Sequence, residues 1–271
     1  MNYHSDDWIM AQVMRHYKEA LNIFSEEQII GIFYSGSANY GLDTINSDVD
    51  TKLIIIPTFK SMALNNTPIS TTHNLENNEQ IVIKDVRSFI PALKKQDINI
   101  LETLFTPYCY INPFYNNDWN KLIEAREDIA RYDTEKAVKS LKGQAISRYA
   151  SIEHKTIQKE KAFNTYNYSP KDLAFLLKLE TYLINYLNEK PYYECIHFDN
   201  SEYLKAVKSG MYSLDEARLV ATQSLNHIKF LSDEYLDSKK GLVNKNIENL
   251  LNEIQYNIVK KAIKKEINNE I

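Results

Sequence analysis

The feature that most constrains the fold is a short polar loop between two apolar segments, residues 29–34 and 53–56. Both segments are rich in isoleucine, and such short apolar runs bounded by turn residues are typical of buried strands. Three of the chain's six glycines occur in this region, among them Gly36, and two aspartates, Asp48 and Asp50, lie at the start of the second β-type segment. The pattern predicts two neighbouring strands, the second of which carries the aspartate pair.

The spacing of Asp48 and Asp50 predicts that both carboxylates point the same way. Successive side chains of an extended segment alternate between opposite faces, so Val49 is expected to turn into the opposite layer. Two hard oxygen ligands side by side suit Mg²⁺, which usually keeps several waters and takes further ligands from substrate phosphates. The sequence therefore predicts a Mg²⁺ site at this pair, with Mn²⁺ as a possible substitute.

Gly36 and Ser37 follow the first apolar segment and are candidates for phosphate binding. Glycine lets the backbone approach a ligand closely because it has no Cβ. Successive N–H groups in such a turn form an anion nest, to which the Ser37 hydroxyl adds a further polar group. Each fragment alone also fits an ordinary turn or a solvated strand face. A phosphate cradle followed by a carboxylate pair is more specific, and it suits metal-assisted phosphoryl transfer.

In this order, the segments Gly36-Ser37 and Ser47-Asp-Val-Asp50 resemble the signature of the polymerase-β-like nucleotidyltransferase superfamily. Within it, the chain is most similar to the predicted nucleotidyltransferases of bacteria and phages, one branch of which is associated with RNA-ligase repair systems. The resemblance implies Mg²⁺-dependent transfer of a nucleoside monophosphate from a triphosphate to a hydroxyl. The nucleotide-binding residues it implies are Gly36, Ser37, Ser47 and Lys52.

The superfamily takes a third carboxylate from a later strand, and the resemblance implies Asp85 for this role. The next β-type run, residues 80–86, offers Asp85 as its one acid. In the superfamily the three acids hold two Mg²⁺ ions, and the third also helps to deprotonate the attacking hydroxyl. The expected catalytic and metal-binding residues are therefore Asp48, Asp50 and Asp85. As an alternative, Asp85 fits a strand-end or helix N-cap aspartate before Arg87.

The resemblance continues along the chain, in Asp85-Val-Arg87 and in residues 99–105 and 209–216. Auxiliary basic residues that are frequent in the family are missing: Ala38 follows the Gly-Ser, and Phe175 lies where a histidine is common. Asn99 and Glu102 are three residues apart, which places them on one helix face. They could support the site from behind its ligand-binding residues, but we favour an N-cap and a first-turn acid, which explains both without catalysis.

The composition is that of an ordinary globular protein, with 44% apolar and 25% charged residues. No apolar run reaches 18 residues and no signal-peptide pattern is present, so we expect a cytoplasmic protein without a membrane segment. The net charge of −4 argues against a surface coated in positive charge for nucleic acid. A basic stretch, residues 139–161, suits either a solvated helix face, which we favour, or a cleft for triphosphate or RNA.

We expect an α+β fold, in which a small mixed β-sheet nucleotidyltransferase head with flanking helices is followed by an all-α helical body. The predicted divisions are residues 1–112 for the catalytic domain, 113–238 for the helical domain and 239–271 for a C-terminal helix. Ser5 and Ser169-Pro170 are helix start signals, and Gly210 fits the position just after a helix end. The apolar stripe of the last helix is expected to pack on the helical body of its own chain rather than on a partner subunit.

The predicted function is transfer of a nucleoside monophosphate to a hydroxyl acceptor. An RNA 3′ end is the favoured acceptor and a protein hydroxyl the next, with a small molecule after these. The alternative is a nucleotide-binding or scaffold module that keeps the fold without turnover, which the missing basic groups at Ala38 and Phe175 favour. The sequence specifies neither the nucleotide nor the oligomeric state.

Overall fold

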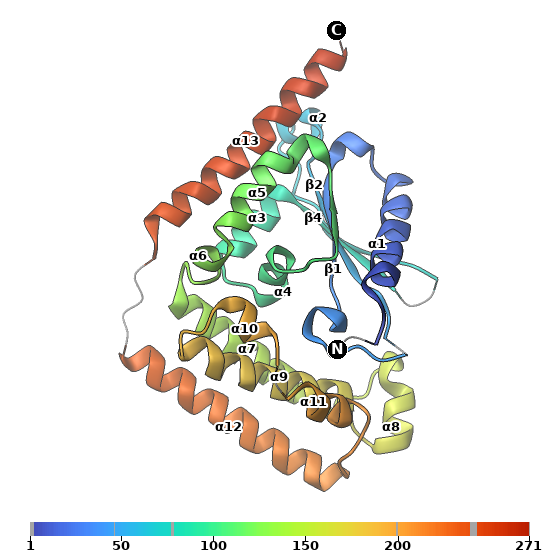
Figure 1. The fold of residues 1–271 in the computed structure, drawn as a ribbon, viewed down its shortest axis with the longest axis vertical. Helices are drawn as coiled ribbons and strands as arrows, with labels where there is room; N and C mark the ends of the chain where they lie inside the picture. The colour runs from blue at the N-terminus through green and yellow to red at the C-terminus, as the bar shows by residue number, and fades with distance from the viewer. Residues whose placement is uncertain (1–2, 46, 77–78, 199, 239–242, 271) are drawn as a thin grey trace. The chain divides into compact units, whose positions relative to one another are not determined.

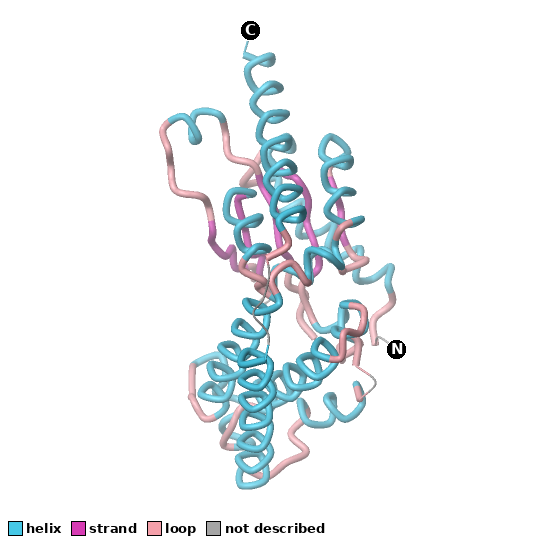
Figure 2. The backbone as a smooth tube through the Cα atoms, turned by 90° about the vertical axis from the view of Figure 1, so that its left-hand side faces the viewer, coloured by secondary structure: helices cyan, strands magenta, loops and turns pink. Residues whose placement is uncertain are grey.

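The computed structural model describes residues 3–45, 47–76, 79–198, 200–238 and 243–270. The chain divides into two compact units, the first comprising Met1–Asn39, Asp43–Asp133 and Val243–Ile271, and the second Tyr40–Leu42 and Thr134–Leu242. The first unit contains a five-stranded mixed sheet with helices, and the elements described in the second unit are helical (Figures 1 and 2). This confirms the predicted α+β class.

The division of the chain differs from the predicted one. The first unit extends to Asp133 instead of ending at 112, and it includes the C-terminal helix α13 (Lys245–Glu270). The physical reason is packing: Trp119, beyond the predicted boundary, stacks on Phe33 of the sheet at a ring-centroid distance of 4.4 Å. The predicted start of the last segment, residue 239, lies outside the described residues.

The sheet has the strand order β3-β4-β2-β1-β5. Its strands are β1 (Ile29–Tyr34), β2 (Thr51–Ile55), β3 (Ser70–Asn74), β4 (Gln80–Asp85) and β5 (Cys109–Ile111). β2 and β4 are parallel, whereas the other neighbouring pairs are antiparallel. Every residue of β1 and β2 is buried, which explains why both read as apolar runs.

Helices cover both faces of this sheet (Figure 1). Helix α1 (Asp6–Leu21) packs on one face, where Ile9 and Val13 join a core with Leu53 of β2. On the other face the Trp119 ring also stacks near Phe89 of α3 (Val86–Lys94), at 5.8 Å between centroids. The other helices described in this unit before its C-terminal helix are α2 (Phe59–Ala63), α4 (Ile98–Leu101), α5 (Asn116–Glu124) and α6 (Arg126–Ala130). Short 3₁₀ turns occupy Glu26–Gln28, Ser37–Tyr40, Glu102–Leu104, Pro113–Tyr115 and Ile157–Lys159.

The C-terminal helix α13 packs within its own chain, but on α3 and α5 of the first unit, so the predicted packing on the helical body is corrected. Its stripe of buried apolar side chains consists of Ile247, Leu251, Ile254 and Ile258. At the edge of this contact, Lys261 Nζ lies 2.7 Å from Asp118 Oδ2. The apolar stripe therefore belongs to the core of the first unit.

The second unit consists of α7 (Thr134–Ile152), α8 (Glu160–Tyr166), α9 (Pro170–Leu187), α10 (Tyr192–Ile196), α11 (Ser201–Lys208) and α12 (Leu214–Ser238). α9 is central and packs against α7, α11 and α12. Three sequence signals are confirmed. Ser5 and Ser169 each accept a hydrogen bond from a first-turn N–H, and Gly210 follows α11 with a φ of 84°.

The basic stretch of residues 139–161 is largely ion-paired within the second unit. Lys142 Nζ lies 2.5 Å from Asp233 Oδ1, and Arg148 and Lys159 both bind the carboxylate of Asp172, each at 2.6 Å. These pairs fit the interpretation as ordinary helix faces better than a cleft for nucleic acid. Among the described helices, none is long and apolar enough to cross a bilayer.

His16 of α1 is a fully buried titratable group in the first unit. Its Nδ1 lies 3.0 Å from Thr51 Oγ1 and its Nε2 lies 3.3 Å from Glu79 Oε2. Burial lowers the pKa of His16 below its usual 6.5, and the hydrogen bond with Glu79 only partly opposes this effect.

We expect the free energy of unfolding to decrease as the pH falls below about 6.5, because the unfolded chain then binds a proton that folded His16 resists. Above that pH, His16 is neutral in both the folded and the unfolded chain, so its contribution to the free energy of unfolding is fully present. Urea unfolding at about pH 7.5 and about pH 5.5 measures the difference. In His16→Gln the loss between these two pH values should be smaller than in the wild type. An equal loss in both proteins would contradict the assignment.

Candidate nucleotide and metal site

The two ends of the loop between β1 and β2 lie side by side. Tyr34 pairs with Thr51 in the antiparallel ladder, and the N–H of Ser35 donates to the carbonyl oxygen of Asp50 at 2.8 Å. The strand pairing therefore continues one residue beyond β1 and β2. As a result, Gly36 comes directly after Ser35, the residue whose backbone pairs with Asp50.

The aspartate pair has the predicted alternation. Val49 is 2% exposed and belongs to the core under α1, whereas Asp48 is exposed and Asp50 is partly exposed. The pair precedes β2, which begins at Thr51, so the expectation that it lies within the strand is corrected. One oxygen of Asp50, Oδ1, accepts the N–H of Gln80 at 3.0 Å, which fixes the side chain at the start of β4.

The hydroxyl groups at the two ends of the loop contact each other. Ser37 Oγ lies 3.2 Å from Ser47 Oγ, which also accepts the N–H of Thr44 at 2.9 Å. Gly36 is required by packing as well, because a Cβ there would lie 2.5 Å from the Tyr34 hydroxyl oxygen. The glycine-serine turn and the Ser47 side of the loop are thus held together.

Lys52 does not have the position expected of a nucleotide-binding residue. It is 5% exposed, and its ammonium forms an ion pair with the carboxylate of Glu102, which is equally buried. The Ser35 hydroxyl also donates to Glu102 Oε1, at 2.8 Å. The Lys52 ammonium is therefore held in a buried ion pair instead of facing a ligand. The prediction that Lys52 contacts the nucleotide directly is corrected.

The interpretation of Asn99 and Glu102 is also wrong. Helix α4 is capped by Asp97, whose side chain accepts the N–H of Asn99 at 3.0 Å. Glu102 is instead the buried partner of Lys52. A lysine inside an otherwise apolar strand was the available signal, since a buried ammonium needs an acid nearby.

Asp85 does not join Asp48 and Asp50. In the parallel register of β2 and β4, Thr51 lies beside Ile81 and Ile55 beside Asp85. Asp85 is thus five residues along the strand from the level of Asp50, or roughly 16 Å at the usual rise.

The carboxylate of Asp85 is also fully engaged. It is 0% exposed, its Oδ2 accepts from Arg87 Nη2 at 2.7 Å, and its Oδ1 accepts the backbone N–H of Arg87 at 2.8 Å. The alternative interpretation, an N-cap of α3, is therefore confirmed. The expected role of Asp85 as third metal ligand and catalytic acid is corrected, because register and burial hold it away from the other two acids.

We expect Asp85→Asn to reduce stability without reducing Mg²⁺-dependent nucleotide binding. The change removes the charge that Arg87 neutralises, and breaking a buried ion pair costs about 3–5 kcal/mol. Urea unfolding measures the stability, and calorimetric titration with ATP and Mg²⁺ at a temperature where the variant is folded measures the binding. A selective loss of nucleotide binding in the folded variant would restore Asp85 to the site.

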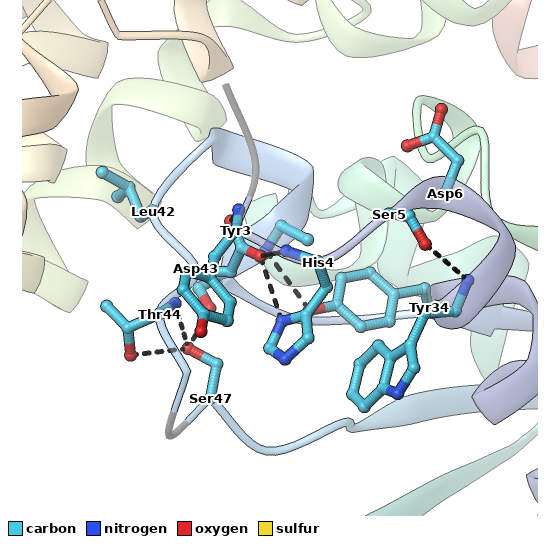
Figure 3. A network of polar contacts seen from close by, with 12 residues as sticks. Tyr3, His4, Ser5, Asp6, Tyr34, Leu42, Asp43, Thr44 and Ser47 are labelled. Atoms are coloured by element: carbon cyan, nitrogen blue, oxygen red, sulfur yellow. Dashed lines mark hydrogen bonds and ion pairs between the residues drawn. The ribbon is translucent and has the colours of Figure 1, made fainter.

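Asp43, a buried carboxylate that no sequence pattern singles out, connects the N-terminal segment to the loop (Figure 3). Asp43 is 2% exposed and accepts the backbone N–H groups of Tyr3 and His4 at 3.0 and 2.9 Å. The Nδ1 of His4 lies 3.2 Å from the same carboxylate, and its ring stacks on Trp8. This contact joins residues 39 positions apart, so no local pattern predicts it.

The Tyr34 phenol lies near the negative charges of the loop. Burial raises the pKa of Tyr34, and the charges of Asp43, Asp48 and Asp50 raise it further, against the hydrogen bond from the Ala38 N–H. The phenol is therefore neutral at physiological pH.

Asp48 and Asp50 suit a site for one metal ion and not for two. In the part of the chain that the structure describes, no group of three or more His, Cys, Asp or Glu side chains is arranged to hold a metal ion. Asp48 and Asp50 offer two carboxylates next to solvent, which suits one Mg²⁺ completed by water and phosphate oxygens. They do not fit a two-ion centre that shares Asp85.

No family model matches the chain, and no curated protein matches it. The resemblance to polymerase-β-like nucleotidyltransferases therefore stays a prediction from the motif residues.

Proposed function

We propose that the first unit binds a nucleoside triphosphate with Mg²⁺ and transfers its monophosphate to a hydroxyl acceptor. The observation that supports this proposal best is the Ser35–Asp50 backbone pairing. It places the Gly36-Ser37 turn and the carboxylates of Asp48 and Asp50 at one end of the sheet. Phosphate groups and a divalent cation need such a juxtaposition of N–H donors and acidic oxygens.

Gly36 and Ser37 would hold the terminal phosphates, and Asp48 and Asp50 would hold the Mg²⁺, which supplies charge neutralisation when bound. The acceptor oxygen forms a bond to the α-phosphorus, and the bond from that phosphorus to the pyrophosphate oxygen breaks. The acceptor proton passes to water at the solvent side of the pair, because Asp85 is out of reach. Positioning and electrostatic stabilisation supply most of the acceleration in this kind of transfer.

The acceptor we propose first is an RNA 3′ end, and a protein hydroxyl is the second. This order rests on the motif resemblance. The pairing of Arg148 and Lys159 with Asp172 does not add to the case for RNA. A cytoplasmic location is part of the same proposal.

A second candidate is a nucleotide-binding module without turnover. The position of Asp85 favours it, because the chain then lacks the third carboxylate that would help to deprotonate the acceptor. Both candidates require the same nucleotide site and differ only in whether pyrophosphate is released.

One experiment separates the candidates. The full chain is incubated with each α-labelled triphosphate, Mg²⁺ or Mn²⁺, and total cellular RNA or protein, and both labelled products and pyrophosphate are measured. Transfer of label with pyrophosphate release supports the enzyme. Mg²⁺-dependent binding of a triphosphate without release supports the module. Absence of both binding and transfer for all four triphosphates would overturn the proposal.

A further inference from the structure

A buried polar cluster connects α1 to the starts of β2 and β4 in the first unit. Glu79, which directly precedes β4, is 8% exposed, and its carboxylate forms an ion pair with Arg15 of α1. Nε2 of His16 lies 3.3 Å from Oε2 of the same carboxylate, and Nδ1 of His16 lies 3.0 Å from Thr51 Oγ1. His16 and Thr51 are both fully buried. The imidazole therefore bridges the residue before β4 and the first residue of β2.

Glu79 determines which nitrogen of His16 carries the proton. Because burial lowers the pKa of His16 below its usual 6.5, the imidazole is neutral at physiological pH. The carboxylate of Glu79, paired with Arg15, can only accept hydrogen bonds, so Nε2 of His16 donates to it. Nδ1 then carries no proton and accepts the hydroxyl of Thr51. The Thr51 side chain is thus held in one direction.

The same two strand starts hold Asp50. Thr51 follows Asp50 in the chain, and Gln80, which follows Glu79, donates its N–H to Asp50 Oδ1 at 3.0 Å. In the parallel register Thr51 lies beside Ile81, so Asp50 and Gln80 precede paired residues of the two strands. The cluster therefore fixes the residue after Asp50 and the residue before its hydrogen-bond donor. Partners of this kind behind a metal ligand matter, since their loss typically lowers metal affinity by about 10–100-fold.

We propose that Glu79 is a positioning residue for the metal site. Through His16 and Gln80 it holds the Asp50 carboxylate in the direction in which that carboxylate binds Mg²⁺. Its own carboxylate is engaged by Arg15 and His16, so it acts through Asp50 and not as a ligand. The inference rests on the proposed function, and it explains why a helix outside the glycine-serine turn would influence the affinity for the metal.

The test is the free Mg²⁺ concentration that half-saturates binding of a non-hydrolysable triphosphate to the full chain. Glu79→Ala is expected to raise this concentration about tenfold or more. Glu79→Gln should remain close to the wild type, because its amide oxygen can still accept from His16. Asp118→Ala is the control for stability: it removes another buried carboxylate of the same unit, one that pairs with Lys261 at 2.7 Å. It should lower the free energy of unfolding without changing the Mg²⁺ requirement.

Circular dichroism establishes that each variant is folded. If Glu79→Ala does not fold, Thr51→Val takes its place, because it removes the hydroxyl that His16 accepts and should also raise the half-saturating Mg²⁺ concentration.

An unchanged Mg²⁺ requirement in the folded variant, with Mg²⁺-dependent binding lost in Asp50→Asn, would overturn this inference and leave the proposed function standing. An equal rise in Asp118→Ala, or a rise in Glu79→Gln as large as in Glu79→Ala, would also overturn it. Absence of Mg²⁺-dependent triphosphate binding in the wild type would overturn the proposed function and this inference with it.

Discussion

Asp50→Asn is expected to lower the affinity for a nucleoside triphosphate with Mg²⁺ by about 100-fold or more, as expected when a charged ligand is lost. The fold should survive, because the asparagine oxygen can still accept the N–H of Gln80 that Asp50 Oδ1 accepts at 3.0 Å. Asp48→Asn should have a similar effect, since the Asp48 side chain is also exposed and, two residues before Asp50, lies on the same face of the extended segment. Calorimetric titration with each of the four triphosphates, with and without Mg²⁺, measures the change.

Glu253→Gln is the matched control for these variants. It removes one negative charge from an exposed position of α13 in the same unit and should leave nucleotide affinity unchanged. Wild-type affinity in both Asp48→Asn and Asp50→Asn, with Mg²⁺ still required, would place the metal elsewhere.

Glu102→Ala is expected to lower the free energy of unfolding by about 3–5 kcal/mol, the usual cost of breaking a buried ion pair. Lys52 is 5% exposed, so its ammonium would lose this carboxylate without gaining much water. The Ser35 hydroxyl would lose the same acceptor. Urea unfolding with a fixed slope measures the difference.

The double variant Lys52→Met/Glu102→Leu separates the charge effect from packing. It replaces both charges by apolar side chains of similar size, and such replacements are often neutral or stabilising. We expect its stability to lie well above that of Glu102→Ala. If the double variant is as unstable as the single one, the ion pair does not explain the effect.

Features that depend on residues close together in the sequence were predicted correctly. The strand over residues 29–34 was predicted with its observed bounds because all of its residues are buried and apolar. Val49 was placed in the core by strand alternation alone, and Ser169 was predicted to start a helix by its own capping chemistry.

Apart from the cap of α4, which is Asp97, and the start of β2 at Thr51, the errors concern contacts between distant parts of the chain. The position of Asp85 depends on the register of β2 against β4, in which Ile55 lies beside Asp85, and that register pairs residues 30 positions apart in the sequence. The pair Lys52–Glu102 spans 50 residues, and only tertiary packing brings it together. The apolar stripe of α13 was likewise visible in the sequence, whereas its packing on α3 and α5 was not.

A crystal structure of the full chain with Mn²⁺ and a non-hydrolysable triphosphate tests the central claim most directly. We predict an anomalous Mn²⁺ peak at ~2.1 Å from carboxylate oxygens of Asp48 and Asp50, the distance usual for a small divalent cation. The triphosphate should lie against the backbone of Gly36 and Ser37. A metal peak and triphosphate bound away from this loop would contradict the account.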